Sequence, residues 1–175
     1  MTSRDTSRIV AIEPSSKGFG FAVLDCPARL LDWGTVRVTK RSNADGLRRV
    51  AILITRYQPD LIVLQDDRIR GFRHGARSRA LIGRVRTLAS RKHLRTRCLQ
   101  WRMVREAIVP AGSATKHAVA AAIAARFPEL ASRLPPPRKA WMSADERITL
   151  FEAVAFAVAA QAADPRRSPL PSPNH

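Results

Sequence analysis

Four acidic residues occupy places in the sequence where α/β proteins bind ligands. Glu13 closes the apolar run RIVAI, and Asp66 and Asp67 follow the apolar run DLIVL after Gln65. Open sheets bind ligands at the carboxyl ends of their strands, so these acids would approach each other if the two strands are neighbours. Glu152 lies in the apolar segment LFEAVAF. Acids gathered at one point would bind divalent cations, and two cations about 3.5–4 Å apart can support phosphodiester cleavage.

Each acid also has a simpler structural interpretation, and the sequence leaves these alternatives open. Glu13 could form an ion pair with one of many arginines. Asp66 and Asp67 could end a strand or cap a turn. Glu152 could be a half-exposed helix residue, although a charge among apolar neighbours is costly unless it is paired or bound to a metal.

The charge of the chain points to an anionic partner. Lys and Arg number 31 against 14 Asp and Glu, which gives a net charge of +17 in 175 residues. The segment 68–105 holds 13 Lys or Arg and no acid. Unmixed positive charge of this kind is typical of phosphate binding, and the planar arginine fork suits phosphate oxygens. Since no base-reading helix or zinc finger is visible, we expect backbone and shape contacts with nucleic acid.

Composition limits the other possibilities. The length predicts one domain with a sizeable core. Cys26 and Cys98 cannot form a disulfide framework, and no run of 18 apolar residues is present. The first residues lack the apolar core of a signal peptide, so we expect a cytoplasmic protein without a membrane span.

Periodicity predicts an α/β fold in a single domain over 8–162, between a frayed N-terminus at 1–7 and a disordered proline-rich tail at 163–175. An antiparallel meander of three strands precedes alternating helices and strands, which favours a mixed sheet with helices on both faces. Strands are expected at 8–13, 19–25, 29–38 with a break near 32–34, 60–64 and 95–100. Helices are expected at 44–57, 76–92, 101–108, 114–126 after Ser113, and 144–162 after a capping box of Ser143 and Glu146.

Four segments together resemble the RuvC-like Holliday junction resolvases of the RNase H-like superfamily. They are IVAIEPSSKGFGFAVLD, YQPDLIVLQDD, REAIVPAGSATKH and DERITLFEAVAFAVAA, and they span most of residues 8–162 in order. The resemblance implies an RNase H-like five-stranded mixed sheet and an endonuclease that uses Mg²⁺ or Mn²⁺, with a two-metal site, on branched DNA. It also implies a homodimer, since a four-way junction needs two symmetric cuts.

The resemblance carries over residue by residue, with departures. Glu13 matches the family's first-strand acid, which is normally Asp, and Glu152 matches its last-helix Asp. The family's fourth-strand Glu falls on Gln65, with Asp66 directly after it. A further family acid falls on Thr149, which carries no charge, and Asp145 lies two turns before Glu152. Residues that match basic positions near the scissile phosphate are Arg105 and Lys116.

Two hypotheses follow. In the first, the chain is a metal-dependent nuclease with Glu13, Asp66 and Glu152 as catalytic acids and with Gln65 and Asp145 as further metal ligands. In the second, the chain binds structured DNA or RNA without cutting, because Gln65 and Thr149 replace acids.

Phe72 could stack on an unpaired base or anchor its own loop. The predicted nucleic-acid contacts are Lys17, Arg70, Phe72, Arg73, Arg77, Arg84, Arg105 and Lys116. Helix 76–92 has an apolar stripe that could pair with its twofold mate.

Overall fold

The computed structural model describes residues 7–25, 27, 29–38, 42–69, 74–109, 115–139, 141–142 and 145–164. Its centre is a five-stranded mixed sheet of order β3-β2-β1-β4-β5. The meander β1-β2-β3 is antiparallel, and β4 and β5 continue the sheet in parallel with β1. This arrangement confirms the predicted fold class. The strands are β1 (Arg8–Ser15), β2 (Gly18–Asp25), β3 (Arg29–Arg37), β4 (Leu61–Gln65) and β5 (Arg95–Leu99).

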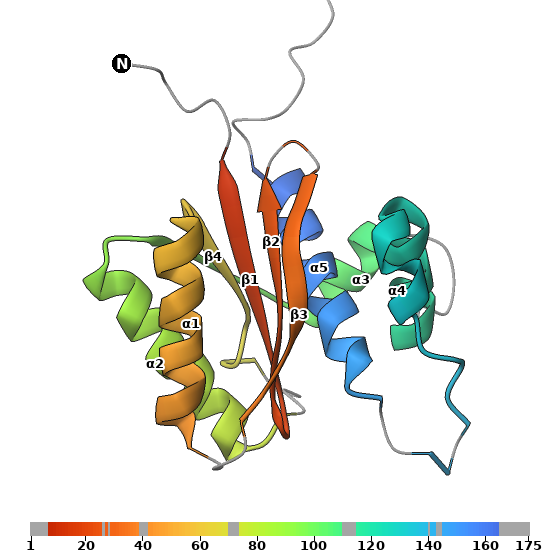
Figure 1. Cartoon of the computed structure of the whole chain (residues 1–175), viewed down its shortest axis with the longest axis horizontal. Coiled ribbons are helices and arrows are strands. Elements are labelled where there is room, and N and C mark those ends of the chain that lie inside the picture. The colour runs from red at the N-terminus through yellow and green to blue at the C-terminus, as the bar shows by residue number, and fades with distance from the viewer. Residues whose placement is uncertain are drawn as a thin grey trace, which may run out of the picture.

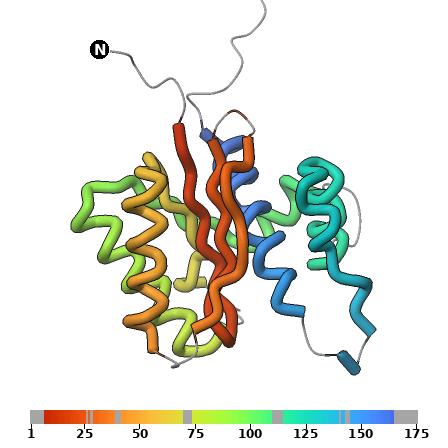
Figure 2. Tube along the Cα trace, viewed as in Figure 1, coloured from red at the N-terminus to blue at the C-terminus, as the bar shows by residue number. Residues whose placement is uncertain are grey.

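Helices cover both faces of the sheet, as predicted (Figure 1). On one face lie α1 (Asn43–Tyr57) and α2 (Ala76–Arg91). On the other face α5 (Arg147–Ala162) crosses the strands, and α3 (Trp101–Ile108) and α4 (Lys116–Arg126) pack outside it. The trace in Figure 2 shows the same three layers, with η1 (Pro128–Arg133) leading from α4 into the connector before α5.

Strand alternation divides the interior into two cores. Side chains of successive strand residues point to opposite faces. Ile9 and Ala11 of β1 therefore belong to the core under α5, whereas Val10 and Ile12 belong to the core under α1 and α2. The same alternation decides which polar residues at the strand ends can meet α5.

Helix α5 approaches the sheet closely at Gly20. A Cβ atom added to Gly20 would lie 2.3 Å from the carbonyl oxygen of Thr149, far inside van der Waals contact. Gly20 is also the residue of β2 that pairs with Glu13 of β1. The missing side chain thus lets the first turns of α5 rest on the strand beside Glu13. From Leu150 to Ala160 every residue of α5 is buried.

Three predicted boundaries are wrong in detail. Thr115 caps α4 by accepting a hydrogen bond from the Ala118 amide, so the helix begins after the predicted start at 114, and Ser113 lies outside the described residues. Helix α5 begins at Arg147, after the predicted start at 144; the carboxylate of Glu146 pairs with Lys17 and Arg37, and its predicted capping partner Ser143 lies outside the described residues. Strand β3 runs through 32–34 without the predicted break, and its pairing with β2 shifts between Val23 and Leu24.

The ends of the chain mostly lie outside the description. Residues 1–6 and 165–175 are not described, so the predicted frayed start and proline-rich tail stay predictions. Within the described helices, none has the length and apolar character needed to cross a membrane.

Candidate active site

Glu13 and Glu152 form a buried acidic pair between β1 and α5. Glu13 is 1% exposed and Glu152 is 3% exposed. Glu13 follows Ile9 and Ala11 at every second position of β1, so its side chain points to the α5 face. Glu13 Oε1 lies 3.2 Å from His74 Nε2, and Glu152 Oε1 lies 2.6 Å from the ammonium nitrogen Nζ of Lys116.

Burial dominates the electrostatics of this pair. The pKa of Glu13 is raised from 4.5 to about 7: burial is the largest cause and the nearby Glu152 adds to it, while the hydrogen bond with His74 and the charge of Lys116 oppose the rise. A carboxylic acid in such surroundings holds its proton near neutral pH unless more positive charge arrives. With both carboxyl groups ionised, the pair would carry two buried negative charges, of which one is paired with the Lys116 ammonium.

Gln65 completes the polar end of this site. Ile12 of β1 pairs with Leu64 of β4, so the next residues, Glu13 and Gln65, stand side by side. Gln65, Glu152, His74 and Lys116 line one cavity of about 200 Å³, which we call the basin, together with Ile69, Gln100, Trp101 and Arg102. Within the described part of the chain, Glu13 Oε2 and Gln65 Oε1 are buried without a hydrogen-bond partner.

Asp66 does not join the basin. It follows Ile62 and Leu64, which face α1 and α2, and its side chain points to that side as well. Its Oδ1 accepts a hydrogen bond of 3.0 Å from Arg68 Nε. Burial alone would raise the pKa of Asp66, but the hydrogen bonds from Arg68 outweigh burial and lower it. The predicted meeting of Asp66 with Glu13 and Glu152 is thus not found, and the neighbouring Asp67 pairs with Arg86.

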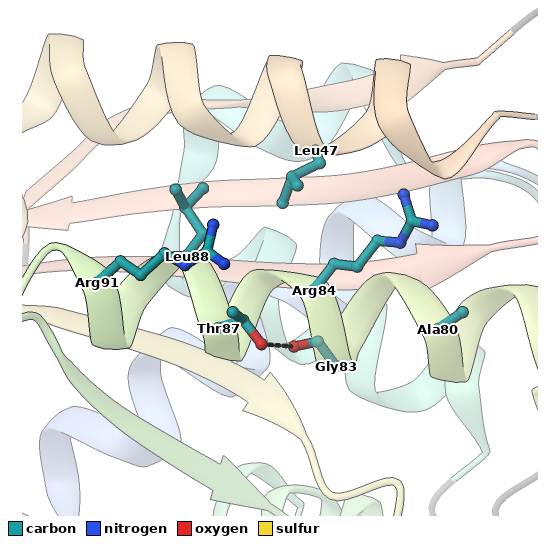
Figure 3. A pocket seen from close by; sticks show the side chains of 7 residues that line it. All are labelled: Leu47, Ala80, Gly83, Arg84, Thr87, Leu88 and Arg91. Carbon is teal, nitrogen blue, oxygen red and sulfur yellow. Dashed lines mark hydrogen bonds between the residues drawn. The ribbon is translucent and has the colours of Figure 1, made fainter.

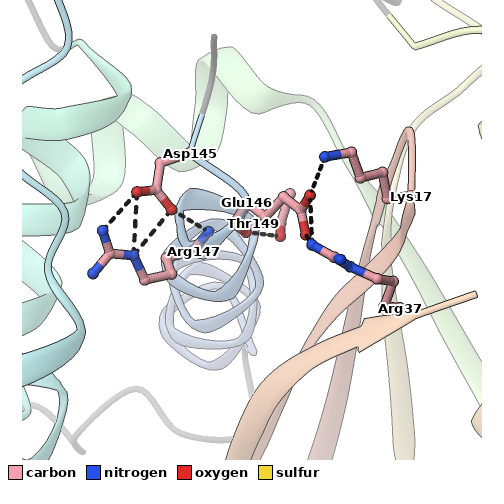
Figure 4. Close-up of polar contacts among 6 residues, drawn as sticks. All are labelled: Lys17, Arg37, Asp145, Glu146, Arg147 and Thr149. Carbon is pink, nitrogen blue, oxygen red and sulfur yellow. Dashed lines mark hydrogen bonds and ion pairs between the residues drawn. The ribbon is translucent and has the colours of Figure 1, made fainter. Parts of the chain in front are cut away.

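The other predicted acid of the site is also engaged elsewhere. Asp145 Oδ2 lies 2.7 Å from Arg147 Nη2, and this pair lowers the pKa of Asp145 (Figure 4). Thr149, which stands at a family acid position, donates its hydroxyl to the Glu146 carbonyl oxygen at 2.6 Å. Among the residues that the structure describes, no three His, Cys, Asp or Glu are grouped so that they could hold a metal ion.

The donor set of the basin nevertheless suits a hard divalent cation. Mg²⁺ takes carboxylate and amide oxygens and keeps several waters, so it does not need a cage of protein ligands. Glu13, Gln65 and Glu152 offer two carboxylates and one amide oxygen, of which Glu13 Oε2 and Gln65 Oε1 have no other partner among the described residues. These residues fit such an ion, but they supply two negative charges, whereas three acidic ligands would supply three.

The predicted nucleic-acid contacts are spread around this end of the molecule. Lys17 lies at the turn between β1 and β2, where its Nζ is 2.6 Å from Glu146 Oε1 (Figure 4). Arg77 donates to the Ser16 carbonyl oxygen. Lys116 reaches the basin itself. Arg84 lies farther off, in the groove between α1 and α2. Arg70, Phe72 and Arg73 lie outside the described residues.

Sequence reasoning missed five residues of the basin: Ile69, His74, Gln100, Trp101 and Arg102. Trp101 lies 5.9 Å from Lys116 Nζ, ring centroid to nitrogen, and also packs on Phe156. Their position in the sequence could have indicated the site: Gln100 and Trp101 directly follow β5, which runs parallel to β4, so they lie at the same edge of the sheet as Gln65 at the end of β4. Arg102 lines the basin three residues before Arg105, whose predicted phosphate contact stays a prediction.

Comparison with known proteins identifies the fold. No family model matches the sequence, and no curated protein matches it. Solved structures do match. The RuvC structure of Thermus thermophilus superposes with a TM-score of 0.66 at 19% identity, covering 89% of this chain and 95% of that one. The T. thermophilus RuvC complex with a Holliday junction substrate gives 0.64 at 19% identity, covering 90% and 94%.

A more distant structure agrees. The yeast mitochondrial Holliday junction resolvase Ydc2 superposes with a TM-score of 0.51 at 11% identity, covering 89% of this chain and 78% of that one. The chain therefore has the RuvC-like variant of the RNase H-like fold, as the sequence resemblance implies.

Proposed function

We propose that this protein is a structure-selective endonuclease that binds branched DNA, such as a four-way junction, and hydrolyses a phosphodiester at the basin. The observation that carries the proposal is the buried carboxyl pair Glu13 and Glu152 beside Gln65, where Glu13 Oε2 and Gln65 Oε1 have no hydrogen-bond partner among the described residues. Likeness to resolvase structures, one of them in complex with a Holliday junction substrate, supports the choice of DNA. The net charge of +17 supports a polyanionic substrate.

Six residues in and beside the basin have roles in this proposal. Glu13, Gln65 and Glu152 would hold Mg²⁺ or Mn²⁺, which when bound supplies Lewis-acid stabilisation of the phosphate and an acidified water. Lys116 lies 2.6 Å from Glu152, so its ammonium would neutralise charge that develops on the phosphate oxygens. His74 holds Glu13 in place through its hydrogen bond, and Trp101 lies under the Lys116 ammonium.

A specific observation favours a second candidate, a protein of this fold that binds branched DNA without cutting it. Asp66 is paired with Arg68 away from the basin, and Gln65 and Thr149 carry no charge. Two carboxylates would then be too few for hydrolysis. In this candidate, the protein still binds branched DNA through its basic surface.

We further propose that the active form is a homodimer, with α2 at the twofold interface. A groove of about 450 Å³ lies between α1 and α2, where Leu47 and Leu88 are flanked by Arg84 and Arg91 (Figure 3). Partly exposed leucines favour a protein contact, and two copies related by a twofold axis would match the two strands cut at a four-way junction. Sedimentation of a monomer, both free and on a junction, would contradict this assignment.

The deciding experiment is cleavage of an end-labelled four-way junction in Mg²⁺ or Mn²⁺, beside a duplex of the same sequence. The nuclease proposal expects paired cuts near the branch in the junction only. Tight junction binding without product, at several enzyme and metal concentrations, would select the non-cutting binder. Equal affinity for junction and duplex would reject both candidates.

A further inference from the structure

A second cavity lies next to the basin, on the other side of Lys116. It holds about 540 Å³ between the start of α4, the connector 134–139 and the start of α5. Lys116 lines both cavities, so a molecule in one would lie beside a group held in the other. The volume is typical of pockets that take small organic ligands, which run from about 300 to 1,000 Å³.

The walls of this cavity are apolar and the surrounding charge is positive. Pro135, Pro136, Pro137, Met142 and Ile148 supply the apolar surface. The cationic groups are Lys116 and Arg138. The single carboxylate, Asp145, is already paired with Arg147, so it offers little repulsion to an anion.

The cavity is held open by its own hydrogen bonds. His117 Nε2 lies 3.0 Å from the carbonyl oxygen of Pro135, and Arg138 Nε donates to the carbonyl oxygen of Met142. Three consecutive prolines fix φ along the wall, which reduces the number of conformations that the connector can adopt. A preformed site of this kind binds without a large ordering cost.

An aromatic residue stands in the same connector segment. Trp141, which precedes Met142, is 81% exposed, and Lys139 Nζ lies 5.4 Å from the centroid of its ring. An exposed tryptophan beside cations is costly for a free surface but suits a nucleic acid, because bases stack on aromatic faces while phosphates meet the cations.

We infer that this cavity accepts one unpaired nucleotide of the bound strand, with the base against Met142 and the prolines and its phosphate toward Lys116 and Arg138. The inference rests on the proposed function, since it places the nucleotide next to the phosphate in the basin. A branch point offers nucleotides that are already unstacked, which lowers the energy needed to extrude one. The cavity would thus help the protein to distinguish a branch from a continuous duplex.

The test uses a probe that needs no branch: a DNA trinucleotide with a central 2-aminopurine, followed by its fluorescence on titration with the full chain. We expect Arg138→Glu to weaken binding by at least about fivefold, which corresponds to the lower end of the binding energy of one stacked base. Arg133→Glu, an equal charge change in η1, should stay within about twofold. Equal losses in the two variants would overturn the inference, because only general charge would then matter.

A second pair of variants tests the space itself. Met142→Trp should fill the entrance of the cavity and weaken binding of the trinucleotide. Met103→Trp, at another exposed methionine on α3, should leave this binding unchanged. A trinucleotide with an abasic centre should compete poorly if the base is bound. An abasic competitor as strong as the parent, or an unchanged affinity in Met142→Trp, would overturn the inference.

Junction binding by the same variants separates this inference from the proposed function. A junction preference over duplex with no trinucleotide effect would remove the nucleotide cavity and keep the proposed function. Trinucleotide binding that depends on Arg138 and Met142, without any junction preference, would keep the cavity and remove the branched substrate.

Discussion

Two acidic clusters on α5 differ in how their charge is balanced. At the start of the helix, Glu146 lies 2.6 Å from Lys17 Nζ and 2.9 Å from Arg37 Nη2, and its side chain is 32% exposed (Figure 4). Farther along, the buried Glu152 pairs with one cation, Lys116, among the described residues, and its charge acts on the second carboxyl group, that of Glu13.

The pKa values show the contrast. The bonds from Lys17 and then from Arg37 lower the pKa of Glu146, whereas burial and Glu152 raise the pKa of Glu13. The first cluster is complete in itself and clamps the β1–β2 turn to α5. The second is electrostatically incomplete and gains from a bound cation. Buried acids without a matching cation for each carboxyl group, rather than the number of acids, therefore distinguish a candidate site from a structural contact.

The largest expected effect comes from removing one charge of the incomplete cluster. Glu152→Gln should lower junction cleavage by at least about a hundredfold. The substitution removes a negative charge and replaces one carboxylate oxygen, and a small misplacement of a catalytic group alone can lower the rate by about that factor. Junction binding should persist, since a negative charge near phosphate is lost. Gel-based cleavage and binding assays would measure both, with Glu129→Gln on η1 as the control. Cleavage that survives Glu152→Gln would place the reaction elsewhere.

Adding charge to the same cluster should act in the opposite direction. We expect Gln65→Glu to raise Mn²⁺ affinity about 10- to 100-fold, the range seen when a metal site gains or loses an interacting group. The rise of the melting temperature with added Mn²⁺ reports this without a cleavage assay. Gln58→Glu, at an exposed position after α1, is the control. No difference between the two variants would remove Gln65 from the site.

The orientation of Asp66 makes the next prediction. Asp66→Asn should leave cleavage within about threefold of the parent, because the side chain faces Arg68 and not the basin; losing an exposed ion pair costs up to about 1 kcal/mol of stability. Initial cleavage rates on a junction would check this. A loss as large as that of Glu152→Gln would show that Asp66 turns into the basin when DNA is bound.

The raised pKa of Glu13 predicts a pH dependence in the metal-free protein. Because the folded pKa of about 7 lies above the unfolded 4.5, the folded state binds the proton more tightly, and stability falls as pH rises through this window. Glu13→Gln should flatten that fall. Urea unfolding at pH 5 and pH 8 in EDTA would measure it. A parent that is equally stable at both pH values would contradict the buried, uncompensated state of Glu13.

The smallest effect is expected at the balanced cluster. Glu146→Gln breaks two exposed ion pairs, each worth about 0.2–1 kcal/mol, and should lower stability by no more than about 2 kcal/mol at low salt and less at high salt. Thermal melts at two NaCl concentrations would measure the change. A loss of several kcal/mol would mean that the clamp also positions Glu152.

The sequence predicted the fold well because periodicity and chain order suffice for it. Alternating apolar residues indicated the strands, and the meander followed by helix–strand units indicated a mixed sheet, which the structure confirms. The starts of α4 and α5 were missed: Thr115 caps α4, and Glu146 at the start of α5 pairs with Lys17. Such choices depend on tertiary partners that are distant in sequence.

The candidate site was predicted in part. Glu13 and Glu152 could be found because an acid in an apolar segment is costly without a partner. The choice between Gln65 and Asp66 was within reach, since alternation along β4 places Gln65 on the face of Leu61 and Val63, which lie in the core under α5. His74 could not be assigned, because its contact with Glu13 joins residues far apart in sequence.

The position of β5 has a consequence for the protein at high concentration. This strand forms one edge of the sheet, is only 5 residues long, and carries Arg95 exposed and Arg97 partly buried. Open edges invite other chains to add strands, and short edges with positive charges discourage such additions. Arg97 also donates to the carbonyl oxygen of Ala160 at the end of α5, which ties this edge to the helix. The arginines of β5 thus protect the free protein from edge-to-edge aggregation.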